Sequence, residues 1–207
     1  MIKVNKFKKD LNKLGNIIVI SAPSGAGKTT ICDAIVRSDK NVVRSVSYTT
    51  RSPRKGEKNS IEYFFVKETE FKQMIKEKRF VEYAKVHNNY YGTSKDFVDK
   101  TLKSSKNVLL EIDVQGGLKI KKQYPQSCMI FIMTKNLNIL KQRLISRNKD
   151  CTETINIRLK NAKKEIQCLK KYEYLVINDN LEKAIDSVKT IIKSLKYKII
   201  ANQNYFI

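Results

Sequence analysis

Tryptophan is absent from this sequence, histidine occurs once, and no apolar run is long enough to cross a membrane. A transmembrane helix needs about 18 consecutive apolar residues. The apolar stretch from Ile17 to Ile20 is far shorter, and it is also too short for the core of a signal peptide. The basic segment before it carries Asp10 and lacks arginine, unlike a transit peptide. We therefore expect a cytoplasmic protein with no membrane partner.

Paired cysteine motifs are missing as well. The four cysteines show neither CxxC spacing nor the density of a secreted disulfide scaffold. They are Cys32, Cys128, Cys151 and Cys168. This usage predicts free thiols in a reducing compartment.

Acidic residues are scarce, 20 against 42 Lys and Arg, and the formal net charge is +22. Such an excess usually favours polyanions such as nucleic acid. The lysines, however, are spread along the whole chain and never form a block of five or six. A chain rich in Lys, Asn and Ile is also typical of an A/T-rich genome. We therefore expect no specific nucleic-acid partner, although the field would favour small anionic nucleotides.

Short β-type apolar runs alternate with longer helical patterns, which predicts an α/β fold with a parallel sheet flanked by helices. The length, 207 residues, suits one domain with small movable inserts. Four buried strands are expected to form the core sheet, at 16–21, 107–113, 128–133 and 174–178. Helices are expected at 29–37, 137–147, 152–172 and 181–196.

The segment 43–104 is too long for a simple crossover between two parallel strands, so we interpret it as a separate lobe. It carries shorter elements, with expected strands at 43–49, 63–66 and 80–86 and a helix at 68–78. The expected division is a basic amino-terminal extension at 1–15, core segments at 16–42, 105–147 and 159–207, the inserted lobe at 43–104 and a lid at 148–158.

A phosphate-binding loop follows the first strand. It consists of Ala22, Pro23, Ser24, Gly25, Ala26, Gly27, Lys28, Thr29 and Thr30. This matches the P-loop pattern GxxxxGK[ST], with alanine in place of the first glycine. Backbone N–H groups and the helix dipole hold phosphate there, Lys28 reaches the β- and γ-oxygens, and the Thr29 hydroxyl is the expected ligand of Mg²⁺. The loop predicts binding of a nucleoside triphosphate such as ATP, but many enzyme classes share it.

Three segments of the lobe suit a second nucleotide, namely 45–57, 62–66, and 80–84 together with 89–93. Arg51 and Arg54 are spaced to fork onto a phosphate, and the hydroxyls of Tyr63 and Tyr91 add neutral donors. Together they are expected to bind a monophosphate.

The same segments also suit guanine. Its adjacent N1–H and N2–H donors fit a carboxylate such as Glu82, and its O6 acceptor fits the hydroxyls of Ser47 and Thr93. Adenine presents the opposite pattern at that edge. The lobe therefore favours a guanine nucleotide as the second substrate.

From about residue 16 to residue 194, the order and spacing of these motifs resemble the guanylate kinase family. The resemblance implies Mg²⁺-dependent transfer of the ATP γ-phosphoryl group to GMP, and also to dGMP, with 43–104 as the GMP-binding lobe. It assigns the GMP contacts to the seven lobe residues above, adds Asp113 as a further acidic contact, and places Asn178 on the adenine side. Glu111 stands where some members have Asp, which leaves open whether it contacts the metal. His87 falls at a variable position, so we expect a structural or surface role.

Three arginines fit the lid and the transferring phosphoryl group. Arg143 and Arg147 lie four apart on one predicted helix face, and Arg158 follows a polar stretch. Arginine suits the charge spread over such a group, so these three join Lys28 and Arg51 as candidate catalytic residues. Asn148 stands where the family usually has glycine, and it tolerates a left-handed hinge conformation.

Two other functions are weighed against the kinase. A non-catalytic interaction module, known among guanylate-kinase-like domains, predicts a degraded P-loop, whereas Lys28 and Thr29 are present. A P-loop enzyme acting on nucleic acid would fit the charge but lacks a second basic and aromatic motif. The sequence leaves the oligomeric state open, a homodimer included.

Overall fold

Five parallel strands form the central sheet of the computed structural model, which describes residues 14–86, 88–146 and 152–197. Their order across the sheet is β2-β7-β1-β8-β9. The strands are β1 (Ile17–Ser21), β2 (Val42–Arg44), β7 (Asn107–Glu111), β8 (Cys128–Met133) and β9 (Tyr174–Ile177). All five residues of β1 are buried, as expected for a parallel strand covered on both faces.

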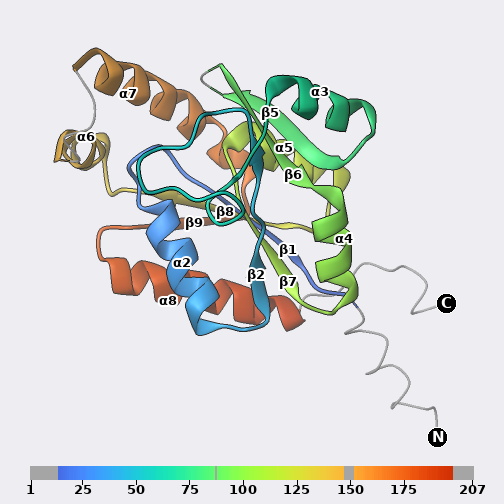
Figure 1. Cartoon of the computed structure of the whole chain (residues 1–207). Coiled ribbons are helices and arrows are strands. Elements are labelled where there is room, and N and C mark those ends of the chain that lie inside the picture. The colour runs from blue at the N-terminus through green and yellow to red at the C-terminus, as the bar shows by residue number, and fades with distance from the viewer. Residues whose placement is uncertain (1–13, 87, 147–151, 198–207) are drawn as a thin grey trace, which may run out of the picture.

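Helices cover the two faces of this sheet (Figure 1). The helices of the described ranges are α2 (Lys28–Ser38), α3 (Glu68–Lys76), α4 (Lys95–Lys103), α5 (Val114–Gln123), α6 (Leu137–Ser146), α7 (Thr152–Gln167) and α8 (Leu181–Ser194), with short 3₁₀ turns at Leu169–Lys171 and Leu195–Tyr197. Of these, α3 packs on the second sheet described below. No helix in these described ranges is long and apolar enough to cross a membrane.

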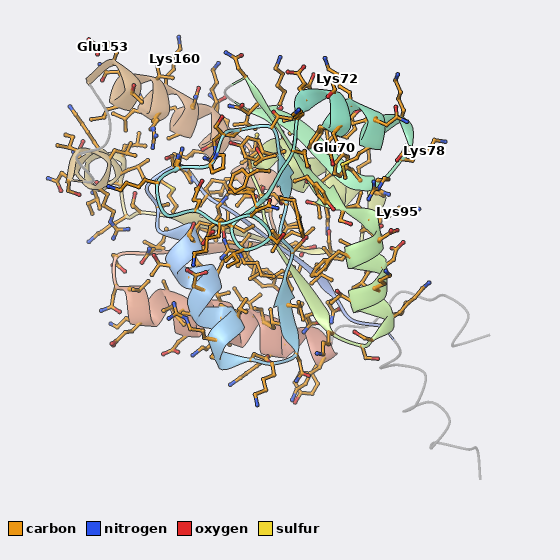
Figure 2. The ribbon with its side chains drawn as sticks, in the orientation of Figure 1. Glu70, Lys72, Lys78, Lys95, Glu153 and Lys160 are labelled. Atoms are coloured by element: carbon orange, nitrogen blue, oxygen red, sulfur yellow. The ribbon has the colours of Figure 1, made fainter. Side chains whose placement is uncertain are left out.

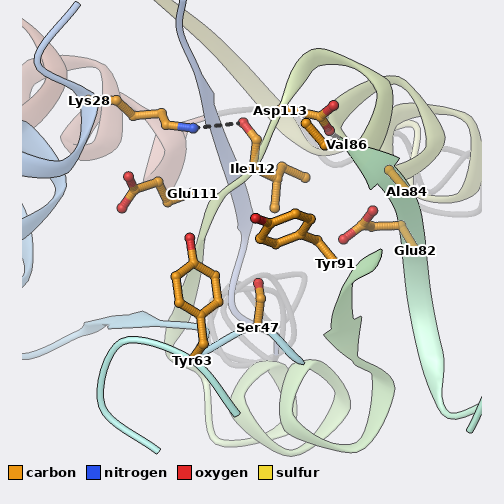
Figure 3. Close-up of a pocket in the computed structure, with 10 residues that line it drawn as sticks. All are labelled: Lys28, Ser47, Tyr63, Glu82, Ala84, Val86, Tyr91, Glu111, Ile112 and Asp113. Atoms are coloured by element: carbon orange, nitrogen blue, oxygen red, sulfur yellow. Dashed lines mark hydrogen bonds between the residues drawn. The ribbon is translucent and has the colours of Figure 1, made fainter. Parts of the chain in front are cut away.

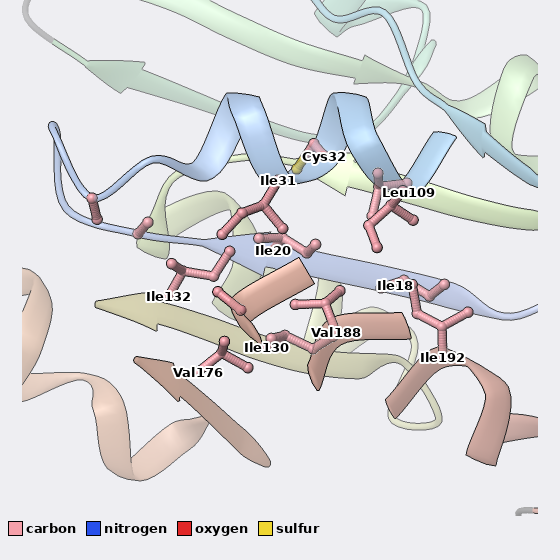
Figure 4. Packing of buried hydrophobic residues seen from close by; sticks show 14 of the residues in the cluster. Ile18, Ile20, Ile31, Cys32, Leu109, Ile130, Ile132, Val176, Val188 and Ile192 are labelled. Atoms are coloured by element: carbon pink, nitrogen blue, oxygen red, sulfur yellow. The ribbon is translucent and has the colours of Figure 1, made fainter. Parts of the chain in front are cut away.

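Alternation along the strands builds two apolar layers, because successive side chains point to opposite faces. On one face, Ile18 and Ile20 of β1 pack with Ile31 of α2 and Val188 of α8 (Figure 4). On the other face, Ile17 and Val19 belong to a second cluster with residues of α4 and α5. The sheet is thereby fixed between two helical layers, and its carboxyl edge is left for ligands.

The prediction of four strands in the core sheet was wrong, because the sheet has five. The predicted strand at 43–49 divides in two: β2 joins the central sheet, where Arg44 pairs with Leu109, and β3 (Tyr48–Thr49) joins another sheet. An edge strand of three residues, of which only Val42 is buried, has too short an apolar pattern to be recognised. The predicted helix at 152–172 ends earlier, at Gln167, before a 3₁₀ turn.

The second sheet has the order β4-β3-β6-β5, with β4 at Phe64–Phe65, β5 at Phe80–Val86 and β6 at Asn89–Ser94. Phe71 of α3 stacks on Phe80 at 4.6 Å and on Tyr90 at 5.4 Å between ring centroids, which gives this lobe its own small core. The register of β5 against β6 shifts between Phe80 and Glu82. Val81 and Glu82 are consequently both buried, although they are neighbours.

Candidate active site

The P-loop closes tightly between β1 and α2. Gly25 and Gly27 have φ angles of 95° and 92°, in the left-handed region that side chains rarely adopt. A Cβ on Gly27 would lie 2.4 Å from the Asn178 side-chain nitrogen. That amide donates a 2.7 Å hydrogen bond to the Ala26 carbonyl, and the Ala26 N–H donates to the Pro23 carbonyl at 3.0 Å. The loop conformation therefore depends on glycine and on a brace from the end of β9.

Lys28 and Thr29 begin α2 and face the carboxyl end of β7. The Lys28 ammonium donates to the Ile112 carbonyl at 3.2 Å, and the Thr29 hydroxyl donates to Glu111 Oε1 at 2.6 Å. Because the hydroxyl is the donor in this hydrogen bond, the lone pairs of its oxygen remain available for a cation. Within the described ranges no group of three or more His, Cys, Asp or Glu forms a metal cage. A single available hydroxyl ligand suits Mg²⁺, which binds few protein ligands and keeps waters and phosphates.

A cavity of about 180 Å³ lies between the P-loop side of the sheet and the second sheet (Figure 3). Its ten lining residues are Lys28, Ser47, Tyr63, Glu82, Ala84, Val86, Tyr91, Glu111, Ile112 and Asp113. Lys28 and Glu111 lie at one end and Glu82 at the other, while the hydroxyls of Ser47, Tyr63 and Tyr91 project between them (Figure 3). The cavity thus joins a phosphate-binding end to a carboxylate end.

Glu82 provides the buried carboxylate, with an exposed fraction of 6%. The Thr93 hydroxyl donates to its Oε1 at 2.6 Å, and a Cβ on Gly116 would approach its Oε2 to 2.8 Å. Burial raises the pKa of Glu82 to about 7, and the nearby Asp113 carboxylate also raises it. Asp113 itself caps α5 by accepting from the Gly116 N–H at 2.9 Å. One oxygen of Glu82 is therefore satisfied and the carboxylate is poised to accept further donors.

The two lobe arginines are held differently from the sequence-based expectation. The Arg51 guanidinium pairs with Glu57 at 2.9 Å and lies over the Tyr63 ring, 5.4 Å from its centroid. The same Glu57 accepts from the backbone N–H of Arg54 at 2.7 Å, and the Arg54 side chain is exposed. Neither arginine is among the ten residues lining the described cavity.

Glu57 was missed as a functional candidate. It lies within the segment that carries the arginine pair, and its acidic character three residues after the second arginine was the available signal. Burial raises the pKa of Tyr63, whose ring lies against Arg51, with the Glu111 carboxylate as the next cause. The Tyr63 hydroxyl therefore stays protonated and can donate to an anion.

A second hollow of about 350 Å³ lies on the other side of the P-loop, lined by Gly25, Gly27, Thr30, Arg143, Ser146, Asn178, Asp179 and Leu181. Arg143 donates to the Asn178 carbonyl at 2.9 Å, and Arg158 donates to the Ser24 hydroxyl at 3.1 Å. Two of the three expected lid arginines are thus beside the P-loop. The third, Arg147, lies outside the described residues, as do Asn148, Cys151 and His87.

Glu165, on α7, is a further acidic group that sequence reasoning missed. Burial raises its pKa to about 7, with opposing electrostatic effects of Lys28 and Asp113. It lies seven residues after Arg158, so both share one face of the helix. The helical spacing from Arg158 was the signal that could have found it.

Strand order, loop and helix together define the class of P-loop nucleotide-binding proteins, with the loop at the carboxyl edge of a parallel sheet. The sequence profile of the guanylate kinase family matches residues 14–195. The chain belongs to that family.

Individual relatives agree with this assignment. A guanylate kinase of Caldanaerobacter subterraneus is 43% identical, with 95% of this chain and 96% of the relative covered. One of Helicobacter pylori is 48% identical, with coverage of 92% and 93%. The crystal structure of guanylate kinase from Anaplasma phagocytophilum superposes with a TM-score of 0.76 at 30% identity, covering 90% of this chain and 89% of that one. The expected family and fold class are confirmed.

Proposed function

We propose that this protein transfers the γ-phosphoryl group of ATP to GMP, producing ADP and GDP. Family membership supports the reaction. The observation that carries the substrate assignment is the cavity, which joins Lys28 at the P-loop to the buried Glu82 carboxylate. A guanine base fits the carboxylate end, and its 5′-phosphate is then directed toward the P-loop.

At the guanine end, Glu82 accepts from N1–H and N2–H while Ser47 and Thr93 contact O6. The Thr93 hydroxyl donates its single proton to Glu82, so on binding GMP it would turn from the carboxylate to donate to O6. Asp113, on the same cavity wall, supplies the further acidic contact. These side chains select the base, and other residues contact the phosphoryl group that is transferred.

At the phosphate end, Arg51, Arg54, Tyr63 and Tyr91 bind the GMP phosphate. Glu57 holds the Arg51 guanidinium and the Arg54 backbone, so we propose that it releases the arginines toward the incoming phosphate. A bidentate arginine contact both neutralises and orients the attacking group.

The P-loop, residues 22–30, binds ATP, with the hollow around Asn178 taking the adenine side. A GMP phosphate oxygen attacks the γ-phosphorus in line, and the bond to the β,γ-bridging oxygen breaks as ADP leaves. Lys28 and the lid arginines Arg143, Arg147 and Arg158 stabilise the charge on the transferring oxygens. No side-chain nucleophile is required.

Mg²⁺ is the proposed cofactor, and if bound it would neutralise part of the charge on the ATP phosphates. Thr29 is the proposed protein ligand. Glu111 orders the Thr29 hydroxyl through the 2.6 Å hydrogen bond and does not need to contact the metal itself.

We propose that the protein acts in the cytoplasm on small nucleotides, without a specific nucleic-acid partner. Charged side chains of both signs project from different elements, including Glu70 and Lys72 of α3, Lys95 of α4 and Lys160 of α7 (Figure 2). Some of this charge is paired locally, as between Lys72 and Glu68 at 2.7 Å. The basic excess is therefore distributed over the surface.

A coupled assay of ADP formation with GMP, dGMP, AMP and UMP tests the proposal. We expect GMP to be the best acceptor, dGMP to be used, and AMP and UMP to be poor. Equal turnover of AMP and GMP, or no turnover of GMP, would contradict it. A salt-dependent oligonucleotide binding assay separates the enzyme from a nucleic-acid-directed P-loop protein.

A further inference from the structure

Arg44 bridges two acidic side chains from different elements. At the end of β2, its NH1 contacts Asp33 Oδ1 of α2 at 2.5 Å, and its NH2 contacts Glu111 Oε2 at the end of β7. The exposed fractions are 32% for the arginine, 39% for Asp33 and 11% for Glu111. The contact to Glu111 is thus the better shielded of the two, where an ion pair is less screened by water.

The two oxygens of Glu111 have different partners. Oε2 pairs with Arg44, while Oε1 accepts the 2.6 Å hydrogen bond from the Thr29 hydroxyl. The ion pair with the guanidinium holds Oε2 on one side, and because a carboxylate is rigid and planar this sets its rotation. That rotation decides whether Oε1 faces Thr29. Arg44, Glu111 and Thr29 therefore form a relay that ends at the hydroxyl expected to bind Mg²⁺.

Backbone pairing already holds β2 in place without this side chain. Val42, Val43 and Arg44 pair in register with Asn107, Val108 and Leu109. The outer ion pair to Asp33, being partly exposed, contributes little to stability. The geometry of Glu111 is what depends on the guanidinium.

Removing the guanidinium would free Glu111 Oε2 and release the carboxylate from its present rotation. Thr29 would then lose the aligned acceptor of its hydroxyl hydrogen bond.

We propose that Arg44 is a positioning residue for the magnesium site, acting through Glu111 on the Thr29 hydroxyl. The inference rests on the proposed function, in which Thr29 binds Mg²⁺ beside ATP. Arg44 touches neither the metal nor the reacting atoms. Its effect should therefore be seen in how strongly Mg²⁺ increases the affinity for ATP.

Titration calorimetry of ATP in excess Mg²⁺ and in EDTA tests this with Arg44→Met. Loss of a partner behind a metal ligand typically lowers metal affinity by about 10- to 100-fold. We expect the gain in ATP affinity that Mg²⁺ gives to fall by about 10-fold, with the affinity in EDTA unchanged. The Mg²⁺ concentration for half-maximal activity should rise, while KM for GMP stays close to wild type.

Arg37→Met is the matched control, because Arg37 is an exposed residue of α2 that donates to the Asp33 carbonyl within its own helix. It removes the same charge and should leave the Mg²⁺ dependence unchanged. Arg44→Lys keeps the positive charge but loses the guanidinium that contacts two carboxylates, so it should retain part of the gain in ATP affinity that Mg²⁺ gives. Thermal unfolding without nucleotide or metal checks that each variant folds; if Arg44→Met does not, Arg44→Lys carries the test through a smaller loss of the Mg²⁺ gain.

The inference would be overturned if Mg²⁺ raised the ATP affinity of a folded Arg44 variant as much as that of wild type. It would also be overturned if the variant lost as much ATP affinity in EDTA as in Mg²⁺. Failure of the proposed function looks different, because the wild-type chain itself would then fail to phosphorylate GMP or would show no Mg²⁺ dependence.

Discussion

Glu82 and Thr93 form a buried hydrogen-bonded pair across β5 and β6, with 2.6 Å between the Thr93 hydroxyl and Glu82 Oε1. The two residues are also cross-strand partners in the register of the sheet. A carboxylate held in this way has one direction left for a ligand, toward the cavity that it lines. The pair therefore defines the guanine-reading end of the proposed GMP site.

Glu82→Ala should lower kcat/KM for GMP far more than for AMP. The variant leaves guanine N1–H and N2–H buried without partners, which costs about 2 to 4 kcal/mol, or roughly 30- to 1,000-fold. Glu82→Gln retains one acceptor and should give an intermediate loss. Steady-state kinetics with both acceptors measures this. If both variants keep the wild-type preference for GMP over AMP, Glu82 does not read the base.

GMP binding should weaken in acid because the guanine donors need the ionised carboxylate. Burial raises the pKa of Glu82 to about 7, so KM for GMP should rise as the pH falls below about 7. In Glu82→Gln this rise in KM should disappear. Glu165, whose pKa burial also raises to about 7, is still present in that variant. A rise of the same size in Glu82→Gln would assign the pH dependence to another group.

The free energy of unfolding should also depend on the protonation of Glu82, but here the protonated form is the favourable one. A carboxyl whose folded-state pKa is raised stabilises the fold at low pH, and this contribution is lost as the pH rises through the folded-state value. For Glu82 the window runs from about pH 4.5 to about pH 7. Denaturant unfolding without nucleotide should therefore show wild type losing stability relative to Glu82→Gln across that window. A constant difference between the two proteins would exclude the raised pKa.

Lys28→Ala should reduce kcat by about 100- to 1,000-fold, the effect of removing a charge-stabilising donor from a transition state. GMP affinity should change by only a few-fold, because the base and phosphate contacts of GMP come from the lobe. Single-turnover rates and GMP titrations separate the two effects. Near-normal turnover would contradict the role of the P-loop lysine.

Arg51→Ala and Arg54→Ala should each raise KM for GMP by about 10- to 100-fold, since a charged hydrogen bond contributes about 1.5 to 3 kcal/mol. KM for ATP should be nearly unchanged. Initial-rate kinetics with each substrate varied in turn provides the measurement. Equal effects on both substrates would indicate general misfolding instead of a lost phosphate contact.

Patterns that are local in the chain were predictable from the sequence. The strand at 80–86 and the helix at 28–38 follow from apolar spacing and from the P-loop, and both appear within a residue of their expected bounds. The short β2 was not predictable, because an edge strand of three residues leaves almost no periodic signal. Its Arg44 consequently escaped notice as well.

Side-chain partners were harder to predict than elements. Arg51 and Arg54 were predicted to bind a phosphate, but spacing alone does not show that Glu57 contacts both residues. The assignment of roles to these residues stays a prediction. The raised pKa of Glu82 likewise depends on burial produced by a register shift, which no alternation rule foresees.

The brace from Asn178 to the Ala26 carbonyl spans 152 positions of the chain. During synthesis the phosphate-binding loop leaves the ribosome before its brace, which follows 152 positions later in the chain. A nascent chain stopped before residue 178 would carry the entire P-loop motif and yet lack the contact that closes it. The P-loop therefore gains this contact only after β9 and Asn178 have been synthesised.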